Sequence, residues 1–330
     1  MTSSENVSAN SPADIPVRTG MARVGTIELC YEDWGDPKAP PYLLIMGLSA
    51  QMLLWPDDFC RALVQRGYRV IRFDNRDIGL STKIKVSSPP VNELLRMTRF
   101  TLGLESPTPY TLYDMAADTV GLLDYLGIQQ AHVAGASMGG MIAQILAGQY
   151  PERVRSLTVI FSSTNQAFLP PPKPAALLPL MKGPGKDASK EELIAHSVKL
   201  MRLIGSPAYP TPEAELRDFA TRLINRSYSP AGVKRQFMAI LSSGSLRSVA
   251  QKISAPTAVI HGDSDPLMRP ACGKAVAHAI RGARLFLIPG MAHDLPKALT
   301  PRIIDLLDDN ARRAADDSTR RSASSKNAAE

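Results

Sequence analysis

The most constraining feature of this sequence is a Gly-x-Ser-x-Gly turn set between a short apolar run and a helix-like pattern. The apolar run ends at Gly135, Ser137 follows two residues later, and Gly139 and Gly140 open a helical pattern that closes at Gly148. Small flanking residues let the backbone turn so tightly that the serine takes a sparsely populated conformation. Such a turn lifts the hydroxyl clear of the fold, so Ser137 is the candidate nucleophile.

Continuous apolar runs alternate with amphipathic helical patterns along most of the chain. One helical pattern covers residues 112–126, and an alternating stretch at 23–34 is typical of an edge strand. The apolar runs lie at residues 41–47, 68–73, around Val133, 154–161, 256–260 and 284–288. This alternation predicts an α/β fold with a mostly parallel central sheet and helices on both faces. Ligands of such sheets bind beyond the carboxyl ends of the strands.

One long segment interrupts the alternation after the sixth predicted strand. It opens with the proline-rich stretch 169–174 and continues with several helical patterns. We predict a helical cap or lid over residues 163–253, whose opening gates access to the site. The rest of the chain divides into three parts. Residues 1–20 are predicted to be a disordered N-terminal segment, residues 21–162 and 254–310 to form the α/β core, and residues 311–330 to be a disordered tail.

Composition argues against several classes of protein. No stretch reaches the roughly 18 apolar residues of a membrane span, so we expect no stable membrane insertion. The first twenty residues lack the basic start and apolar middle of a secretory signal, which favours a cytoplasmic location. The net charge is +7, but no basic helix or aromatic-interleaved patch accompanies it. We therefore expect no nucleic-acid partner.

Cysteine usage argues against a metal centre. The three cysteines, Cys30, Cys60 and Cys272, fit no metal-ligand spacing and cannot all form disulfides with one another. They are expected to be buried thiols in a reducing compartment. No metal or organic cofactor is expected.

A serine hydroxyl needs a base within hydrogen-bond reach, and that base needs a carboxylate to orient it. On a turn of this kind the partners follow in the order acid, then histidine. The two last predicted strands end in His261-Gly-Asp-Ser-Asp-Pro266 and in Gly290-Met-Ala-His293. His293 is therefore the candidate base, and the candidate acid is Asp263 or Asp265.

Other polar residues near strand ends have structural interpretations. His132 and His261 lie within or at the end of buried strands and are expected to be hydrogen-bonded core histidines. Asp74 and Arg76 are expected to form a structural ion pair. Asp294 is expected to be a solvated neighbour of the candidate base.

Taken in order, these motifs resemble those of the α/β-hydrolase fold family, in particular its aclacinomycin methylesterase-like and lipase/esterase-like branch. The resemblance extends from about residue 20 to residue 310. The matching segments are Ile45-Met-Gly-Leu48, Asp74-Asn-Arg-Asp-Ile-Gly-Leu-Ser81, Gly135-Ala-Ser-Met-Gly139, His261-Gly-Asp-Ser-Asp-Pro266 and Gly290-Met-Ala-His293, together with Trp55-Pro56.

The resemblance implies roles for further residues. The family's acid sits just before proline, which selects Asp265 over Asp263. The oxyanion hole of this fold takes one backbone N–H from the residue after the nucleophile, here Met138, and one from the loop after an early strand, here Leu48. The family's usual His-Gly pair in that loop stands here as Met46-Gly47, so a polar side chain that normally braces the loop is missing.

The predicted function is that of a serine hydrolase acting on a carboxylic ester of a small or medium apolar substrate. Ser137, His293 and Asp265 would form the triad, and the reaction would pass through an acyl-enzyme intermediate. The expected partner is a small-molecule ester. Thioesterase, lactonase, carbon–carbon bond hydrolase and cofactor-free perhydrolase activities on the same triad remain alternatives, as does a non-catalytic ligand-binding protein of this fold.

Overall fold

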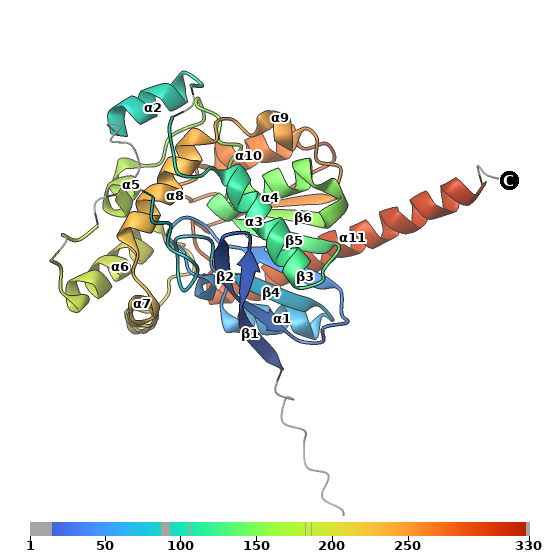
Figure 1. Cartoon of the computed structure of the whole chain (residues 1–330), viewed down its shortest axis with the longest axis horizontal. Helices are drawn as coiled ribbons and strands as arrows, with labels where there is room; N and C mark the ends of the chain where they lie inside the picture. Colours follow the sequence, from blue (N-terminus) through green and yellow to red (C-terminus); the bar gives the residue numbers. More distant parts are fainter. Residues whose placement is uncertain (1–14, 87–92, 105, 182, 186, 328–330) are drawn as a thin grey trace, which may run out of the picture.

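An eight-stranded sheet forms the centre of the molecule (Figure 1). The computed structural model describes residues 15–86, 93–104, 106–181, 183–185 and 187–327. In spatial order the strands are β1 (Val17–Val24), β2 (Ile27–Trp34), β4 (Arg69–Phe73), β3 (Pro41–Ile45), β5 (Ala131–Ala136), β6 (Val154–Ile160), β7 (Thr257–Gly262) and β8 (Arg284–Ile288). β1–β2 and β2–β4 pair antiparallel, and the remaining neighbours pair parallel. The predicted α/β class with a mostly parallel sheet is confirmed.

Helices cover both faces of the sheet because the parallel strands are apolar on both sides. On β3, Leu43 and Ile45 face one core, which α3 (Leu112–Tyr125) and α4 (Met138–Gln149) close. Tyr42 and Leu44 face the other core, which α1 (Asp57–Gln65) and α11 (Thr300–Asn327) cover. This alternation follows from the two-residue period of a strand. α10 (Pro270–Ala279) joins the first face beside β7 and β8.

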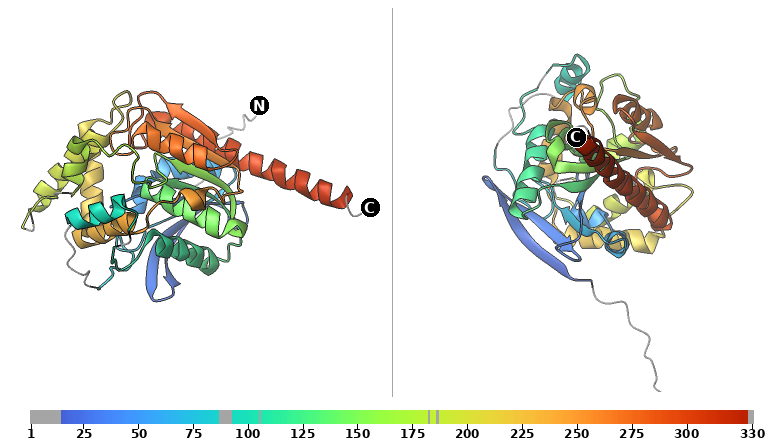
Figure 2. Two further views of the ribbon diagram at one scale, coloured as in Figure 1. Left: turned by 90° about the horizontal axis from the view of Figure 1, so that it is seen from above. Right: turned by 90° about the vertical axis from the view of Figure 1, so that its right-hand side faces the viewer.

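Helices α5 to α9 lie in sequence between β6 and β7. The first four are α5 (Pro174–Met181), α6 (Lys190–Ile204), α7 (Glu213–Arg226) and α8 (Pro230–Ser242). We call residues 174–242, which contain these four helices, the insert. Figure 2 shows the insert on one side of the sheet, away from the projecting end of α11. The short α9 (Arg247–Ala250) instead packs against α4 and α10 and so belongs to the core. α2 (Glu93–Thr101) contacts α8.

The predicted disorder at the two ends differs from the structure. Residues 17–20, assigned to a disordered segment, form the start of β1 and pair with β2, while residues 1–14 lie outside the described part. Residues 311–327, assigned to the predicted disordered tail, continue α11. The alanines and arginines of this stretch have high helix propensity, which a composition-based prediction of disorder ignores. Among the described helices, none has both the length and the hydropathy to cross a bilayer.

His132 on β5 makes the free energy of unfolding depend on pH. It is buried, and its Nδ1 lies 2.8 Å from Ser156 Oγ. Burial lowers the pKa of His132 from 6.5 to about 4. Between these values the unfolded chain binds a proton that the folded chain does not, so this contribution to stability is lost as pH falls.

We expect His132 to reduce the free energy of unfolding by about 2 kcal/mol between pH 7 and pH 5. Urea denaturation of the wild type and of His132→Gln at both pH values measures this, because glutamine does not titrate. The variant should lose less stability on acidification by about that amount. Equal losses in the two proteins would show that His132 is protonated in the folded state.

Candidate active site

Ser137 is the single residue between the end of β5 and the start of α4. Its φ of 56° and ψ of −123° lie in a region that non-glycine residues rarely adopt, which costs on the order of 1–3 kcal/mol. Close packing stabilises this geometry: a Cβ at Gly139 would lie 2.2 Å from the Ile45 carbonyl oxygen, and one at Gly135 would lie 2.3 Å from the Gly139 oxygen. The small residues of the motif therefore let α4 approach β3 and β5 closely enough to present the hydroxyl.

The structure brings Ser137, His293 and Asp265 into one chain of hydrogen bonds. Ser137 Oγ lies 2.9 Å from His293 Nε2, and His293 Nδ1 lies 2.8 Å from Asp265 Oδ2. The histidine ring also packs on Phe161, with ring centroids 4.7 Å apart. These three polar residues come from three different strand ends, after β5, β7 and β8.

The two candidate acids have different surroundings. Asp265 is buried, and its Oδ1 accepts hydrogen bonds from the amides of Leu267 and Met268 at 2.8 and 2.9 Å, which leaves Oδ2 directed at His293. Asp263 is exposed and accepts a hydrogen bond from the Gly290 amide at 2.8 Å. Only Asp265, of these two, contacts the imidazole. Asp263 instead supports the turn at Gly290, which precedes His293 in the chain.

His261 lies next to this chain without joining it. Its ring is fully buried, with Nε2 2.7 Å from the Met268 carbonyl oxygen and 3.8 Å from Asp265 Oδ2. Burial lowers the pKa of His261, so the ring is neutral and donates its Nε2 proton to Met268. The expected core hydrogen bond is made by Nε2, whereas the buried Nδ1 has no hydrogen-bond partner among the described residues.

The first residue of α4 and the loop after β3 both lie against Ser137. Met138 is the first residue of α4, so its N–H has no acceptor within the helix. Leu48 follows Gly47, where an added Cβ would lie 2.9 Å from Ser137 Cβ and 3.3 Å from Ser137 Oγ. The loop after β3 therefore runs directly over the serine. No described residue accepts a hydrogen bond from the Leu48 N–H.

A large cavity opens onto Ser137 and His293. Its volume is about 1930 Å³. It extends from the turn at Ser137 between β5 and α4, here called the elbow, and the loop after β3 to all four helices of the insert. Apolar side chains from both parts line it, among them Met141, Phe161, Leu177, Leu200, Phe219, Leu223 and Phe237. Because the loops at the ends of β3, β5 and β6 also line the cavity, the insert lies over the carboxyl ends of these strands.

The link between α6 and α7 holds the loop that carries His293. The Ile204 carbonyl accepts the His293 amide at 2.9 Å, and Ser206 Oγ accepts the Ala292 amide at 2.8 Å. The Ser206 hydroxyl donates in turn to Asp294. Burial raises the pKa of the Asp294 carboxyl, although the Ser206 hydrogen bond opposes this shift. The expectation of a solvated Asp294 is therefore wrong: it is part of the link between the insert and the histidine loop.

The expected ion pair between Asp74 and Arg76 is also wrong. Arg76 binds Asp118 on α3, with Nε 2.5 Å from Oδ2. Asp74 instead pairs with Arg226 at the end of α7, at 2.7 Å, and accepts the Met52 amide at 2.8 Å. The expected pair was inferred from the closeness of Asp74 and Arg76 in the sequence. The actual partner of Asp74, Arg226, lies far along the chain in the insert.

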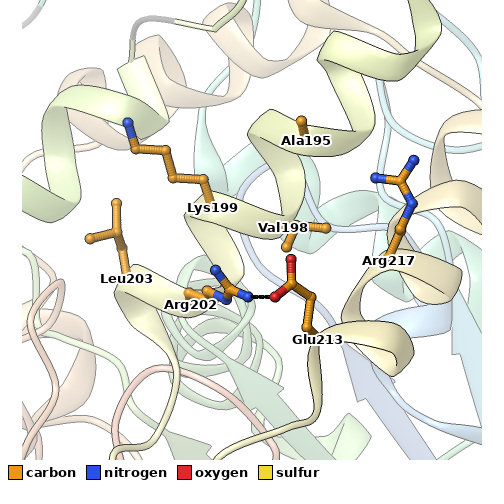
Figure 3. Close-up of a pocket in the computed structure, with 7 residues that line it drawn as sticks. All are labelled: Ala195, Val198, Lys199, Arg202, Leu203, Glu213 and Arg217. Carbon is orange, nitrogen blue, oxygen red and sulfur yellow. Dashed lines mark hydrogen bonds and ion pairs between the residues drawn. The ribbon is translucent and has the colours of Figure 1, made fainter.

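A second hollow, of about 300 Å³, lies between α6 and α7 (Figure 3). Its lining residues are Ala195, Val198, Lys199, Arg202, Leu203, Glu213 and Arg217. Arg202 and Glu213 form an ion pair within it, and Arg217 pairs with Glu191 at 2.5 Å. None of the lining residues belongs to the Ser137 site, and of its four charged residues Arg202 and Glu213 pair with each other.

The three cysteines do not compete with Ser137 as nucleophiles. All are free and buried, and burial raises the pKa of Cys60 to about 12 and also raises that of Cys272, which lines the cavity. Their thiols are therefore protonated near neutral pH. Within the described ranges, no cluster of three or more His, Cys, Asp or Glu side chains is arranged to hold a metal ion.

Sequence reasoning missed the polar residues of the insert that contact the site's loops. Ser206 contacts the histidine loop, Arg226 contacts Asp74, and Gln236 contacts the loop after β3. None lies in a recognisable motif. A buried polar position on an otherwise amphipathic helix, such as Gln236 on α8, is the available signal, but its partner is not evident from the chain order.

This fold and this strand-end constellation define the α/β-hydrolase class, and a comparison with protein families agrees. Residues 40–296 match the family model of the alpha/beta hydrolase fold. The chain belongs to this family, and the resemblance drawn from its motifs is confirmed.

Curated relatives include a methylesterase and a depolymerase. The chain is 29% identical over 307 residues to the rhodomycin D methylesterase of Streptomyces peucetius, a match that covers 85% of this chain and 94% of the relative. It is 28% identical over 256 residues to a poly(3-hydroxyalkanoate) depolymerase of Ectopseudomonas oleovorans, covering 77% of this chain and 78% of that protein.

Solved structures share the fold at lower sequence identity. A meta-cleavage product hydrolase from Pseudomonas fluorescens IP01 superposes with a TM-score of 0.69 at 17% identity, covering 89% of this chain and 98% of that one. The enol-lactonase of Burkholderia xenovorans LB400 gives a TM-score of 0.66 at 24% identity. The match covers 87% of this chain and 99% of the enol-lactonase. These likenesses concern the architecture.

Proposed function

We propose that this protein is a serine carboxylic-ester hydrolase that acts through Ser137, His293 and Asp265. The observation that carries the proposal is the continuous hydrogen-bond chain, 2.9 Å from serine to imidazole and 2.8 Å from imidazole to carboxylate. The methylesterase relatives support the same enzyme class, carboxylic ester hydrolase. The activity needs no group beyond the chain and water.

Acylation begins when Ser137 Oγ attacks the ester carbonyl carbon. His293 Nε2 takes the hydroxyl proton, and Asp265 Oδ2 accepts the Nδ1–H and stabilises the imidazolium. The carbonyl oxygen becomes an oxyanion, which the amides of Met138 and Leu48 receive. The tetrahedral intermediate collapses, the carbon–oxygen bond to the alcohol breaks, and the alcohol leaves with the proton from His293.

Deacylation repeats these steps with water as the nucleophile. His293 removes a proton from the water that attacks the acyl-enzyme, and the same two amides hold the second oxyanion. Collapse then releases the acid and returns the proton to Ser137. The fixed N–H donors are worth several kcal/mol in each step because they need no reorganisation in the buried site.

The cavity supports a bulkier substrate than the small or medium ester that the sequence suggested. Its volume of about 1930 Å³ exceeds the roughly 300–1,000 Å³ of pockets for drug-sized ligands. The lining by leucine, phenylalanine and methionine side chains from the insert favours an apolar body, with the ester placed at Ser137. We propose that the insert is the cap that determines this preference.

A fluorophosphonate probe provides the most direct test. We expect the wild type to gain the mass of one phosphonyl group, located on the peptide that contains Ser137, because Oγ is activated by His293. Intact-mass spectrometry followed by peptide mapping measures this. Hydrolysis of p-nitrophenyl butyrate should be lost in proportion to labelling.

The non-catalytic alternative predicts a different outcome. A ligand-binding protein without an activated serine would remain unlabelled and would not hydrolyse the ester. Labelling at another residue, with Ser137 unmodified, would also contradict the proposal. Heat-denatured protein serves as the control for nonspecific phosphonylation.

A further inference from the structure

The loop after β3 has to hold one peptide unit in a fixed orientation if the Leu48 amide is to receive an oxyanion. That unit joins Gly47 to Leu48, and its N–H and C=O point in opposite directions because the peptide bond is planar and trans. The Gly47 carbonyl accepts the Ala50 amide at 3.3 Å, a long hydrogen bond. This turn alone therefore restrains the unit weakly.

The peptide units on either side are held by side chains from outside the loop. Asn75 Nδ2 donates to the Met46 carbonyl at 2.9 Å, which holds the peptide unit between Met46 and Gly47. The Ser49 amide donates to Gln236 Oε1 at 3.1 Å, which holds the peptide unit between Leu48 and Ser49. Ser49 has a φ of 64°, a conformation that costs a non-glycine residue free energy and needs such support.

Gln236 reaches the loop from α8 of the insert. Its side chain is fully buried, and its Nε2 donates to the Arg76 carbonyl at 3.0 Å. The amide thus spans the loop after β3 and the loop after β4, with both polar atoms used. A buried amide with both ends hydrogen-bonded is held rigidly, since breaking either bond leaves a buried polar group unsatisfied.

Met46 lacks a polar side chain with which to support this loop, and Gln236 supplies a hydrogen bond from another part of the chain. We propose that Gln236 is a positioning residue for the oxyanion hole, holding the Leu48 amide through its bond to Ser49. This inference rests on the proposed function. It makes one side of the catalytic machinery depend on a side chain of the insert.

A neighbouring contact of the same helix separates this role from simple attachment of the insert. Arg235 binds Asp77 with Nε and a terminal nitrogen at 2.8 and 2.6 Å, and so anchors α8 to the core. Its hydrogen bonds go to Asp77, outside residues 46–50. Arg235→Lys weakens the anchoring of α8 while leaving the Gln236–Ser49 bond in place, which makes it the matched control.

The experiment compares the wild type with Gln236→Met, Gln236→Glu and Arg235→Lys. Methionine keeps the length of glutamine but accepts no strong hydrogen bond. Glutamate, protonated at this buried position, keeps an acceptor for the Ser49 amide and a hydroxyl donor for the Arg76 carbonyl. Three quantities are measured: kcat and KM for p-nitrophenyl butyrate, and the inhibition constant of 2,2,2-trifluoroacetophenone. This ketone forms a tetrahedral adduct with the serine and places an oxyanion in the hole.

We expect Gln236→Met to lower kcat by about 10- to 100-fold, less than the full loss of an oxyanion donor, with KM within about threefold of the wild type. The inhibition constant should rise by a similar factor, because the adduct depends on the same amides. Gln236→Glu should recover most of kcat, and Arg235→Lys should retain it. Where Gln236→Met does not fold, Gln236→Asn, whose amide is too short to reach Ser49, takes its place.

Two results would overturn the inference while leaving the proposed function intact. One is a wild-type kcat in Gln236→Met or Gln236→Asn, and the other is an equal loss of kcat in Arg235→Lys, which would reduce Gln236 to an anchor of the insert. A wild type that neither hydrolyses the ester nor binds the ketone would overturn the proposed function and this inference together.

Discussion

Replacing Ser137 by alanine is expected to lower kcat for p-nitrophenyl esters by at least about 10⁴-fold, because no other described group can form the acyl-enzyme in its place. The hydroxyl makes its hydrogen bond to His293 Nε2 at 2.9 Å, and alanine removes both the nucleophile and this bond. The fold should persist, since alanine occupies less space at the elbow. Steady-state kinetics and thermal unfolding on the same preparations measure the two effects.

A cavity thiol provides the control for this variant. Cys272 also lines the cavity, but burial raises its pKa, so Cys272→Ala should retain activity within about threefold. Substantial turnover by the folded Ser137→Ala protein would remove Ser137 from the mechanism. Loss of activity in Cys272→Ala alone would point to a thiol mechanism instead.

The second large effect is expected from Asp265→Asn. The carboxylate fixes the imidazole with its Nδ1 proton directed at Oδ2, 2.8 Å away, and an amide would favour the wrong tautomer. We expect kcat to fall about 10³- to 10⁴-fold at neutral pH, comparable to the same change in other triads. Fluorophosphonate labelling should slow in parallel, because the serine loses its base.

Asp263→Asn is the matched control, since it makes the same chemical change two residues away. Asparagine can still accept the Gly290 amide through its side-chain oxygen, so kcat should stay within about threefold of the wild type. If Asp263→Asn were the more damaging of the two, the acid would be misassigned despite the contact of Asp265 with His293. Circular dichroism on both variants separates a folding defect from a catalytic one.

Much of the architecture could be predicted because it depends on local sequence. The apolar runs locate the parallel strands: the predicted 284–288 is β8, and the predicted 154–161 contains β6. The elbow at Ser137 could be found because glycine is required where α4 meets β5. The candidate base and acid followed from chain order and strand ends, which are also local signals.

The contacts of the insert could not be predicted in this way. Arg226 pairs with Asp74 across a large sequence separation, and nothing near either residue indicates the other. The same holds for Gln236 and Ser49, which meet only when α8 packs on the core. Such pairings depend on tertiary packing, whereas periodicity and turn chemistry report local conformation.

The attachment of the histidine loop to Ile204 and Ser206 has a consequence for engineering. Grafting the insert helices of a relative onto this core would exchange the hydrogen-bond acceptors of the histidine loop along with the cavity walls. Under the proposed function, specificity and turnover are thus physically coupled in this scaffold. A productive hybrid has to preserve the 204–206 backbone and hydroxyl while only the cavity-facing side chains vary.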